Sequence, residues 1–174
     1  ISPNSSHWLR SVYRRIGSIL RLVCLSMPAD SVTMWSCQEL KNAVQQWNGI
    51  DTDWQLHAGD IANCYDELEH HRILDGIRWA LGSLPTWTGK RVANRFSVNK
   101  WNRKQVKLGP DYSGDDEWTN VTVDQVLSVC DFDCQNSIML VESKLYRRRV
   151  GAPMGGFLSA FYAILCFTFI EHQV

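Results

Sequence analysis

Apolar residues recur along this chain at spacings that are typical of helices. The clearest case comprises Ile73, Leu74, Ile77, Leu81 and Leu84, and a second comprises Leu158, Phe161, Tyr162, Leu165 and Phe169. Positions three and four residues apart share one face of a helix. The pattern therefore predicts a helix with one buried side around residues 70–84 and an almost wholly apolar helix over 157–170.

The other segments predict a mixture of helices and short strands. We expect basic amphipathic helix in 1–26, an extended link over 28–36, a helix over 37–47 and a buried strand over 54–59. Residues 96–101 and 104–108 flank Asn102-Arg103 and predict a β-hairpin. A loop over 109–116, a helix within 121–140 and a strand over 142–150 follow. The predicted class is α+β.

Composition favours a folded chain. Its 174 residues are enough for one domain with a sizeable core, and 45% of them are hydrophobic, with eight Trp. Such a composition argues against disorder. No secretory signal peptide is apparent, and the apolar run over 157–170 is shorter than the roughly 18–20 residues that cross a bilayer. We therefore expect no membrane association.

The six cysteines are scattered and fall mainly within apolar stretches. This usage is typical of reduced core thiols in an intracellular protein. Cys130 and Cys134 have a spacing that half of a zinc site would allow, but no second ligand pair at a useful spacing accompanies them. Buried thiols are the favoured interpretation.

The chain carries 18 basic and 18 acidic residues, so its net charge gives no support to nucleic-acid binding. The basic residues are nevertheless clustered near the N-terminus, in the middle of the chain and just before Gly151. Lys100 and Arg103 of the middle cluster, and Arg147 and Arg149 of the last, are the candidate nucleic-acid contacts. The alternative for each cluster is a solvated protein face.

Two segments carry candidate chemistry. In Gly59-Asp60-Ile61-Ala62-Asn63-Cys64-Tyr65-Asp66-Glu67-Leu68, an aspartate directly follows the predicted buried strand, a place where catalytic groups are often found. Further along, Gly151-Ala152-Pro153-Met154-Gly155-Gly156-Phe157-Leu158-Ser159 is a glycine-rich entry to the apolar helix. Its glycines permit backbone conformations closed to other residues, and its proline stiffens the loop.

In this order the two segments resemble motifs in the palm of the reverse transcriptase family of right-hand polymerases. The Cys64-Tyr65-Asp66 triplet is similar to the telomerase and Penelope-like branch. The resemblance implies that Asp60 is catalytic and binds two Mg²⁺ or Mn²⁺ ions, with Ile61 lending its carbonyl. Tyr65 would exclude the 2′-hydroxyl of a ribonucleotide, and Asp66 would be a second acid outside the metal site. Gly151, Pro153, Met154 and Gly155 would contact the substrate beneath the templating base pair.

The resemblance also implies an architecture and partners. Residues 1–50 would form a helical segment of the fingers. Residues 51–174 would form a partial palm of antiparallel strands packed on helices, with a basic hairpin inserted at about 90–120. The activity would be that of an RNA-directed DNA polymerase, a nucleotidyltransferase. Its partners would be an RNA template, a DNA primer, deoxynucleoside triphosphates and the remainder of the polymerase, inside the cell and in the nucleus for a telomerase-like protein.

The chain departs from the family pattern at two points. Met154 stands where most reverse transcriptases have glutamine, and here the loop resembles that of narnavirus and mitovirus RNA-dependent RNA polymerases. Tyr65, five positions after Asp60, instead favours a DNA-making enzyme.

The second departure is that no paired aspartates follow Gly151, and Asp115-Asp116 lies in a predicted polar loop. Two-metal chemistry requires several carboxylates. We therefore expect this chain alone to be inactive. It would be a fragment, or depend on a partner chain, or be an RNA-binding scaffold without catalysis.

Overall fold

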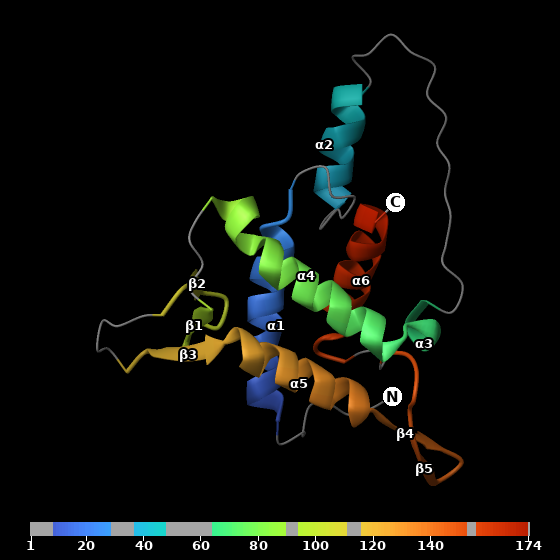
Figure 1. The fold of residues 1–174 in the computed structure, drawn as a ribbon. Helices are drawn as coiled ribbons and strands as arrows, with labels where there is room; N and C mark the ends of the chain where they lie inside the picture. The colour runs from blue at the N-terminus through green and yellow to red at the C-terminus, as the bar shows by residue number, and fades with distance from the viewer. Residues whose placement is uncertain are drawn as a thin grey trace.

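The computed structural model describes residues 9–28, 37–47, 64–89, 94–110, 116–152 and 156–173. These residues form a mixed α+β structure (Figure 1). Its elements are α1 (Arg10–Leu25), α2 (Cys37–Trp47), α3 (Cys64–Glu67), α4 (His70–Thr88), β1 (Arg95–Asn99), β2 (Val106–Leu108), β3 (Trp118–Thr122), α5 (Val123–Gln135), β4 (Ile138–Val141), β5 (Lys144–Arg147) and α6 (Ser159–Gln173). The α+β class predicted from the sequence is confirmed.

The core lies where α4 packs against α6, α5 and α1 (Figure 1). Ile73, Ile77 and Leu84 are completely buried on α4, and Tyr162 and Leu165 are completely buried on α6. These are residues that the helical spacing predicted to share a face. Burial of such side chains removes apolar surface from water and is the main favourable contribution to folding.

Helix α1 belongs to this same core. Its buried side chains include Ile16, Ile19, Leu20 and Val23, whose spacing places them on one side of the helix. The helix contacts α4, α6 and strand β1. The predicted amphipathic helix is thus confirmed over Arg10–Leu25.

The predicted basic hairpin is confirmed in a sheet of order β2-β1-β3, with antiparallel pairing throughout. The strands are shorter than expected, because β1 ends at Asn99. The Asn99 side-chain oxygen accepts hydrogen bonds from the backbone N–H groups of Trp101 and Asn102, which turns the chain away from the strand. Lys100 and Trp101 therefore lie in the turn.

The helix expected within 121–140 is confirmed as α5, with sharper limits. Thr122 Oγ1 accepts from the backbone N–H of Gln125 at 3.1 Å, and Gln125 Oε1 accepts from that of Thr122 at 2.9 Å. This reciprocal capping box satisfies two backbone donors that the first turn leaves free. The helix begins directly after β3, a strand that the sequence analysis did not identify.

The strand expected over 142–150 is confirmed only over Lys144–Arg147, as β5, and it forms a hairpin with β4, which was not predicted. Strand β4 pairs antiparallel with β5 around Glu142 and Ser143, whose φ angles are 48° and 67°. Two consecutive residues with positive φ are typical of a two-residue hairpin turn whose twist suits the flanking strands. Arg148, Arg149 and Val150 follow β5 outside any strand.

Several expectations concern residues outside the described part of the chain. They include the buried strand over 54–59, the site residues Asp60, Ile61, Pro153, Met154 and Gly155, and most of the link over 28–36 and the loop over 109–116. The antiparallel strands described above thus do not include the predicted palm strand. Among the helices that the structure describes, none has the length and apolar character that crossing a membrane requires.

Candidate functional site

The two segments with candidate chemistry lie against each other through their backbones. Gly151 donates its N–H to the carbonyl oxygen of Leu68 at 2.8 Å, and Ala152 donates to that of Tyr65 at 2.7 Å. Leu68 and Ala152 are both buried. The start of the glycine-rich loop is therefore fixed beside α3, the short helix that follows the predicted metal-binding segment.

Gly151 is the residue that permits this approach. Its φ is +90°, a conformation that side chains with a Cβ rarely adopt, and a Cβ built there would lie 2.7 Å from the carbonyl oxygens of both Tyr65 and Asp66. Real Cβ atoms essentially never lie this close to another heavy atom. The close approach of the two backbones thus requires glycine.

An ion pair joins the same two segments. Arg148 Nη1 donates to Asp66 Oδ1 at 2.7 Å, with the arginine side chain 20% exposed and the aspartate side chain 56% exposed. The aspartate side chain is thus more than half exposed to solvent. Its partner is the Arg148 guanidinium, so this carboxylate forms an ion pair within the chain.

His70 contributes a further contact to this arrangement. It is half-buried, and its Nε2 lies 3.0 Å from the carbonyl oxygen of Gly151. A hydrogen bond forms there when the Nε2 carries the proton. This contact could not be predicted from the sequence, because a histidine at the start of an amphipathic helix gives no indication of a distant backbone partner.

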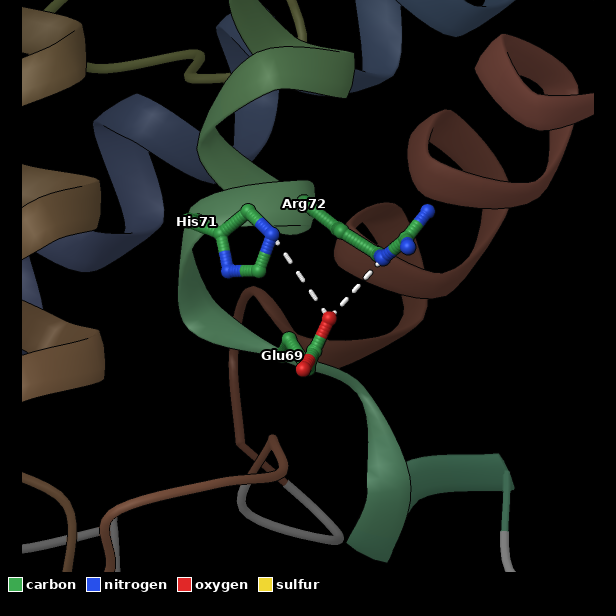
Figure 2. Close-up of polar contacts among 3 residues, drawn as sticks. All are labelled: Glu69, His71 and Arg72. Atoms are coloured by element: carbon green, nitrogen blue, oxygen red, sulfur yellow. Dashed lines mark hydrogen bonds and ion pairs between the residues drawn. The ribbon is translucent and has the colours of Figure 1, made fainter.

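The neighbouring His71 does face solvent, with 67% of its side chain exposed. Figure 2 shows the Glu69 carboxylate between His71 and Arg72 at the start of α4. Arg72 Nε donates to Glu69 Oε2 at 2.9 Å, whereas His71 Nε2 is 3.6 Å from the same oxygen. This exposed cluster holds the first turn of α4 and contributes little stability, since surface ion pairs are screened by water.

Tyr65 contributes both its backbone and its ring. Its carbonyl accepts the Ala152 hydrogen bond, and its half-buried ring packs against the hydrophobic core. The ring is therefore held by its surroundings. Its predicted contact with an incoming sugar depends on residues outside the described part.

The far end of the glycine-rich loop is fixed as well. Ser159 is buried at the start of α6, and its Oγ donates to the Gly156 carbonyl oxygen at 2.9 Å. Leu158 is buried beside α1, and the Arg14 guanidinium lies over the Phe157 ring at 5.6 Å from its centroid. Both ends of the loop are thus attached to the helical core.

The four predicted nucleic-acid contacts lie in two places. Arg147 in β5 donates its Nε–H to the Gln135 carbonyl at the end of α5 at 2.5 Å, and Arg149 is exposed nearby. Lys100 and Arg103 lie in the turn between β1 and β2, where Lys100 forms an ion pair with Asp116. The sheet that contains β1 and β2 lies at the start of α5, and the β4–β5 hairpin lies at its end (Figure 1). That helix has 13 residues, a length of about 20 Å.

A polar cluster of tyrosines and one carboxylate lies within the core. Tyr162 donates its hydroxyl to Asp133 Oδ2 at 2.9 Å, and Tyr13 also hydrogen-bonds this carboxylate. Burial, together with the negative charge of Asp133, raises the pKa of both phenols above the ordinary value. The cluster joins α1, α5 and α6 and is a structural feature of the core.

Cys130 and Cys134 lie in this core and are buried. Burial raises the pKa of Cys134 to about 12 and also raises that of Cys130, which disfavours the thiolate that zinc requires. In the described segments no three His, Cys, Asp or Glu side chains gather closely enough to hold a metal ion. Core packing therefore accounts for both thiols.

The sequence and structure were compared with known proteins. No protein-family model matches the chain, and the searches of curated proteins and of solved structures found no match either.

Proposed function

We propose that this chain is part of a reverse-transcriptase-like polymerase and contains the beginning of its nucleotide site. The observation that carries the proposal is the backbone pairing of Gly151 and Ala152 with Leu68 and Tyr65. The two segments that resemble polymerase motifs are far apart in sequence, and one site needs them together. Because the paired residues are more than 80 positions apart, the contact is not a local turn.

In this proposal Asp60 supplies the catalytic carboxylate. It precedes Tyr65 by five positions, and the backbone of Tyr65 holds the start of the glycine-rich loop. The Asp60 carboxylate and the Ile61 carbonyl are oxygen ligands, which suit Mg²⁺ or Mn²⁺. When bound, such ions activate the primer hydroxyl and stabilise the triphosphate.

The two aspartates of this segment have different roles in the proposal. Asp66 gives one carboxylate oxygen to Arg148, so the pair holds α3 beside the loop. Its proposed role is to position the loop, whereas Asp60 is proposed to hold the metal. The ring of Tyr65 would contact the sugar, and residues 151–155 would lie beneath the base pair.

A viral RNA-dependent RNA polymerase is the second candidate, because Met154 stands where reverse transcriptases have glutamine. Template preference and nucleotide choice separate the two. A deoxynucleotide-specific enzyme whose selectivity falls in Tyr65→Ala supports the first candidate, since removing the ring would make room for a 2′-hydroxyl. Ribonucleotide incorporation that is unchanged in Tyr65→Ala supports the second.

The test is primer extension by the full-length gene product that contains this chain, on RNA and DNA templates with Mg²⁺. We expect Asp60→Asn to abolish incorporation, because an amide is a weaker metal ligand. Asp66→Asn is the matched control and should retain at least part of the activity. Equal activity of wild type and Asp60→Asn would contradict the proposal, as would folded wild-type protein that binds RNA but extends no primer on any template.

A further inference from the structure

The turn between β1 and β2 presents an exposed tryptophan. The Trp101 side chain is 82% exposed, the highest value among the large hydrophobic side chains that the structure describes as exposed. Apolar side chains of this size cost free energy when they remain in water. Its position at the tip of a hairpin leaves the ring accessible to a partner.

The backbone beneath Trp101 is well ordered by hydrogen bonds. The buried Asn99 side chain accepts from the N–H groups of Trp101 and Asn102 at 2.9 and 2.7 Å. Gln105 donates its N–H to the Asn102 carbonyl at 2.9 Å and accepts from the Asn99 N–H at 3.1 Å. The indole is thus attached to a closed turn. Binding would therefore cost little conformational entropy of the backbone.

The charged side chains within the hairpin sequence all have one sign. Residues 94–110 contain five basic side chains, namely Arg95, Lys100, Arg103, Lys104 and Lys107, and no acidic one. In the turn just before β3, Asp116 pairs with Lys100. Lys107 lies over the ring of Trp118, the first residue of β3, at 3.9 Å from its centroid. Arg103 and Lys104 follow Trp101 in the turn itself. The hairpin tip therefore combines an aromatic face with cations.

We propose that this tip binds single-stranded nucleic acid, with a base stacked on Trp101 and phosphates contacted by Arg103 and Lys104. Stacking on an aromatic side chain needs an exposed base face, which a duplex hides and an acidic peptide lacks. The nucleic-acid nature of the partner rests on the proposed function. The hairpin lies at the opposite end of α5 from the loop beside α3 (Figure 1), so it would hold a strand outside the nucleotide site.

The test uses the 174-residue chain and fluorescence anisotropy of short labelled oligo(dT) and oligo(U), with a blunt duplex for comparison. We expect Trp101→Ala to weaken single-strand binding roughly 5- to 150-fold, as loss of one stacked base does. Trp101→Phe should restore part of the affinity. The two oligonucleotides show whether the site prefers a DNA or an RNA strand.

Salt dependence separates stacking from phosphate contact. Lys104→Ala should lower the slope of log affinity against log salt by about 0.7, the value for one phosphate on a single strand. Trp101→Ala should leave that slope unchanged while it lowers affinity. Phe132→Ala removes an exposed aromatic beside Asp131, and Arg78→Ala removes an exposed cation on α4, so these matched controls should bind as wild type does.

The inference is wrong if folded wild type binds no single strand, or if folded Trp101→Ala and Trp101→Phe both bind with wild-type affinity. Circular dichroism measures whether each variant is folded. If Trp101→Ala unfolds, binding by Trp101→Phe and Lys104→Ala decides whether the inference holds. Failure here would leave the Asp60 primer-extension result untouched. Conversely, loss of binding in Trp101→Ala stands even if Asp60 proves unnecessary for extension.

Discussion

Gly151 and Leu68 are joined by a backbone hydrogen bond of 2.8 Å, although they lie 83 positions apart in the sequence. The bond fixes the start of the glycine-rich loop to the segment between α3 and α4. Because the contact is between backbone atoms, its geometry depends on how closely the two chains approach. The φ of +90° at Gly151 shows that this approach excludes a side chain there.

Gly151→Ala is therefore expected to destabilise the protein. The positive φ alone costs about 1–3 kcal/mol in a residue with a Cβ, and the Cβ would also displace the carbonyls of Tyr65 and Asp66. Urea unfolding measures the loss of free energy. Gly82→Ala in α4 is the control, since its Cβ would meet nothing within 4 Å and alanine favours helices. Equal stability of the two variants would contradict the close approach.

The Asp66–Arg148 pair is expected to couple weakly. Asp66 is 56% exposed, so water screens the charges and the coupling energy should be at most about 1 kcal/mol. A double-mutant cycle with Asp66→Asn and Arg148→Ala at low salt measures it. The Asp75–Arg78 pair within α4 is the comparison, and an ion pair of that kind contributes about 0.2–0.5 kcal/mol. A coupling energy well above about 1 kcal/mol would contradict the solvent exposure of this ion pair.

Stability is expected to fall at alkaline pH. Burial raises the pKa of both Cys24 and Cys134 from 9.0 to about 12. A raised pKa in the folded state means that the unfolded chain loses these protons first. The stabilisation is therefore complete below pH 9 and is lost as pH rises toward 12, at up to about 1.4 kcal/mol per pH unit for each thiol.

Urea unfolding under reducing conditions, from about pH 8 to about pH 11, checks this dependence. Cys24→Ala should flatten the curve, whatever its effect on stability at neutral pH, because one titrating group is removed. The raised pKa of Tyr13, caused by burial and by Asp133, adds to the loss above pH 10. An unfolding free energy that is constant over the range would mean that the thiols are not buried as described.

Apolar spacing predicted the helices well because burial itself imposes that spacing. On α4, Ile73, Ile77 and Leu84 are buried as expected. The helix expected over 37–47 coincides with α2, although none of its described side chains is buried. The hairpin turn at Glu142 and Ser143 was missed because neither residue is the glycine or asparagine that usually marks positive φ.

The candidate site was harder to predict than the helices. The sequence indicated that Gly151 needed conformational freedom, but not that its backbone would meet that of Leu68. Contacts between backbone atoms are almost independent of side-chain type, so they leave little trace in the sequence. His70 and Arg148 were missed for a related reason, since each contacts a residue more than 80 positions away. Trp101 was predicted to lie in a strand, but the strand ends at Asn99, whose side chain stabilises the turn. The apolar pattern of the sequence does not indicate this side-chain contact.

The most direct test of the central claim is paramagnetic broadening by Mn²⁺ with a deoxynucleoside triphosphate, measured by NMR on the 174-residue chain. This measurement detects weak binding and needs no turnover. If Asp60 and the glycine-rich loop form one site, the amide signals of Tyr65, Gly151 and Ala152 should broaden in wild type and in Asp66→Asn. They should stay sharp in Asp60→Asn. Broadening that persists in Asp60→Asn, or that is centred on Asp116 and Glu117 instead, would contradict the claim.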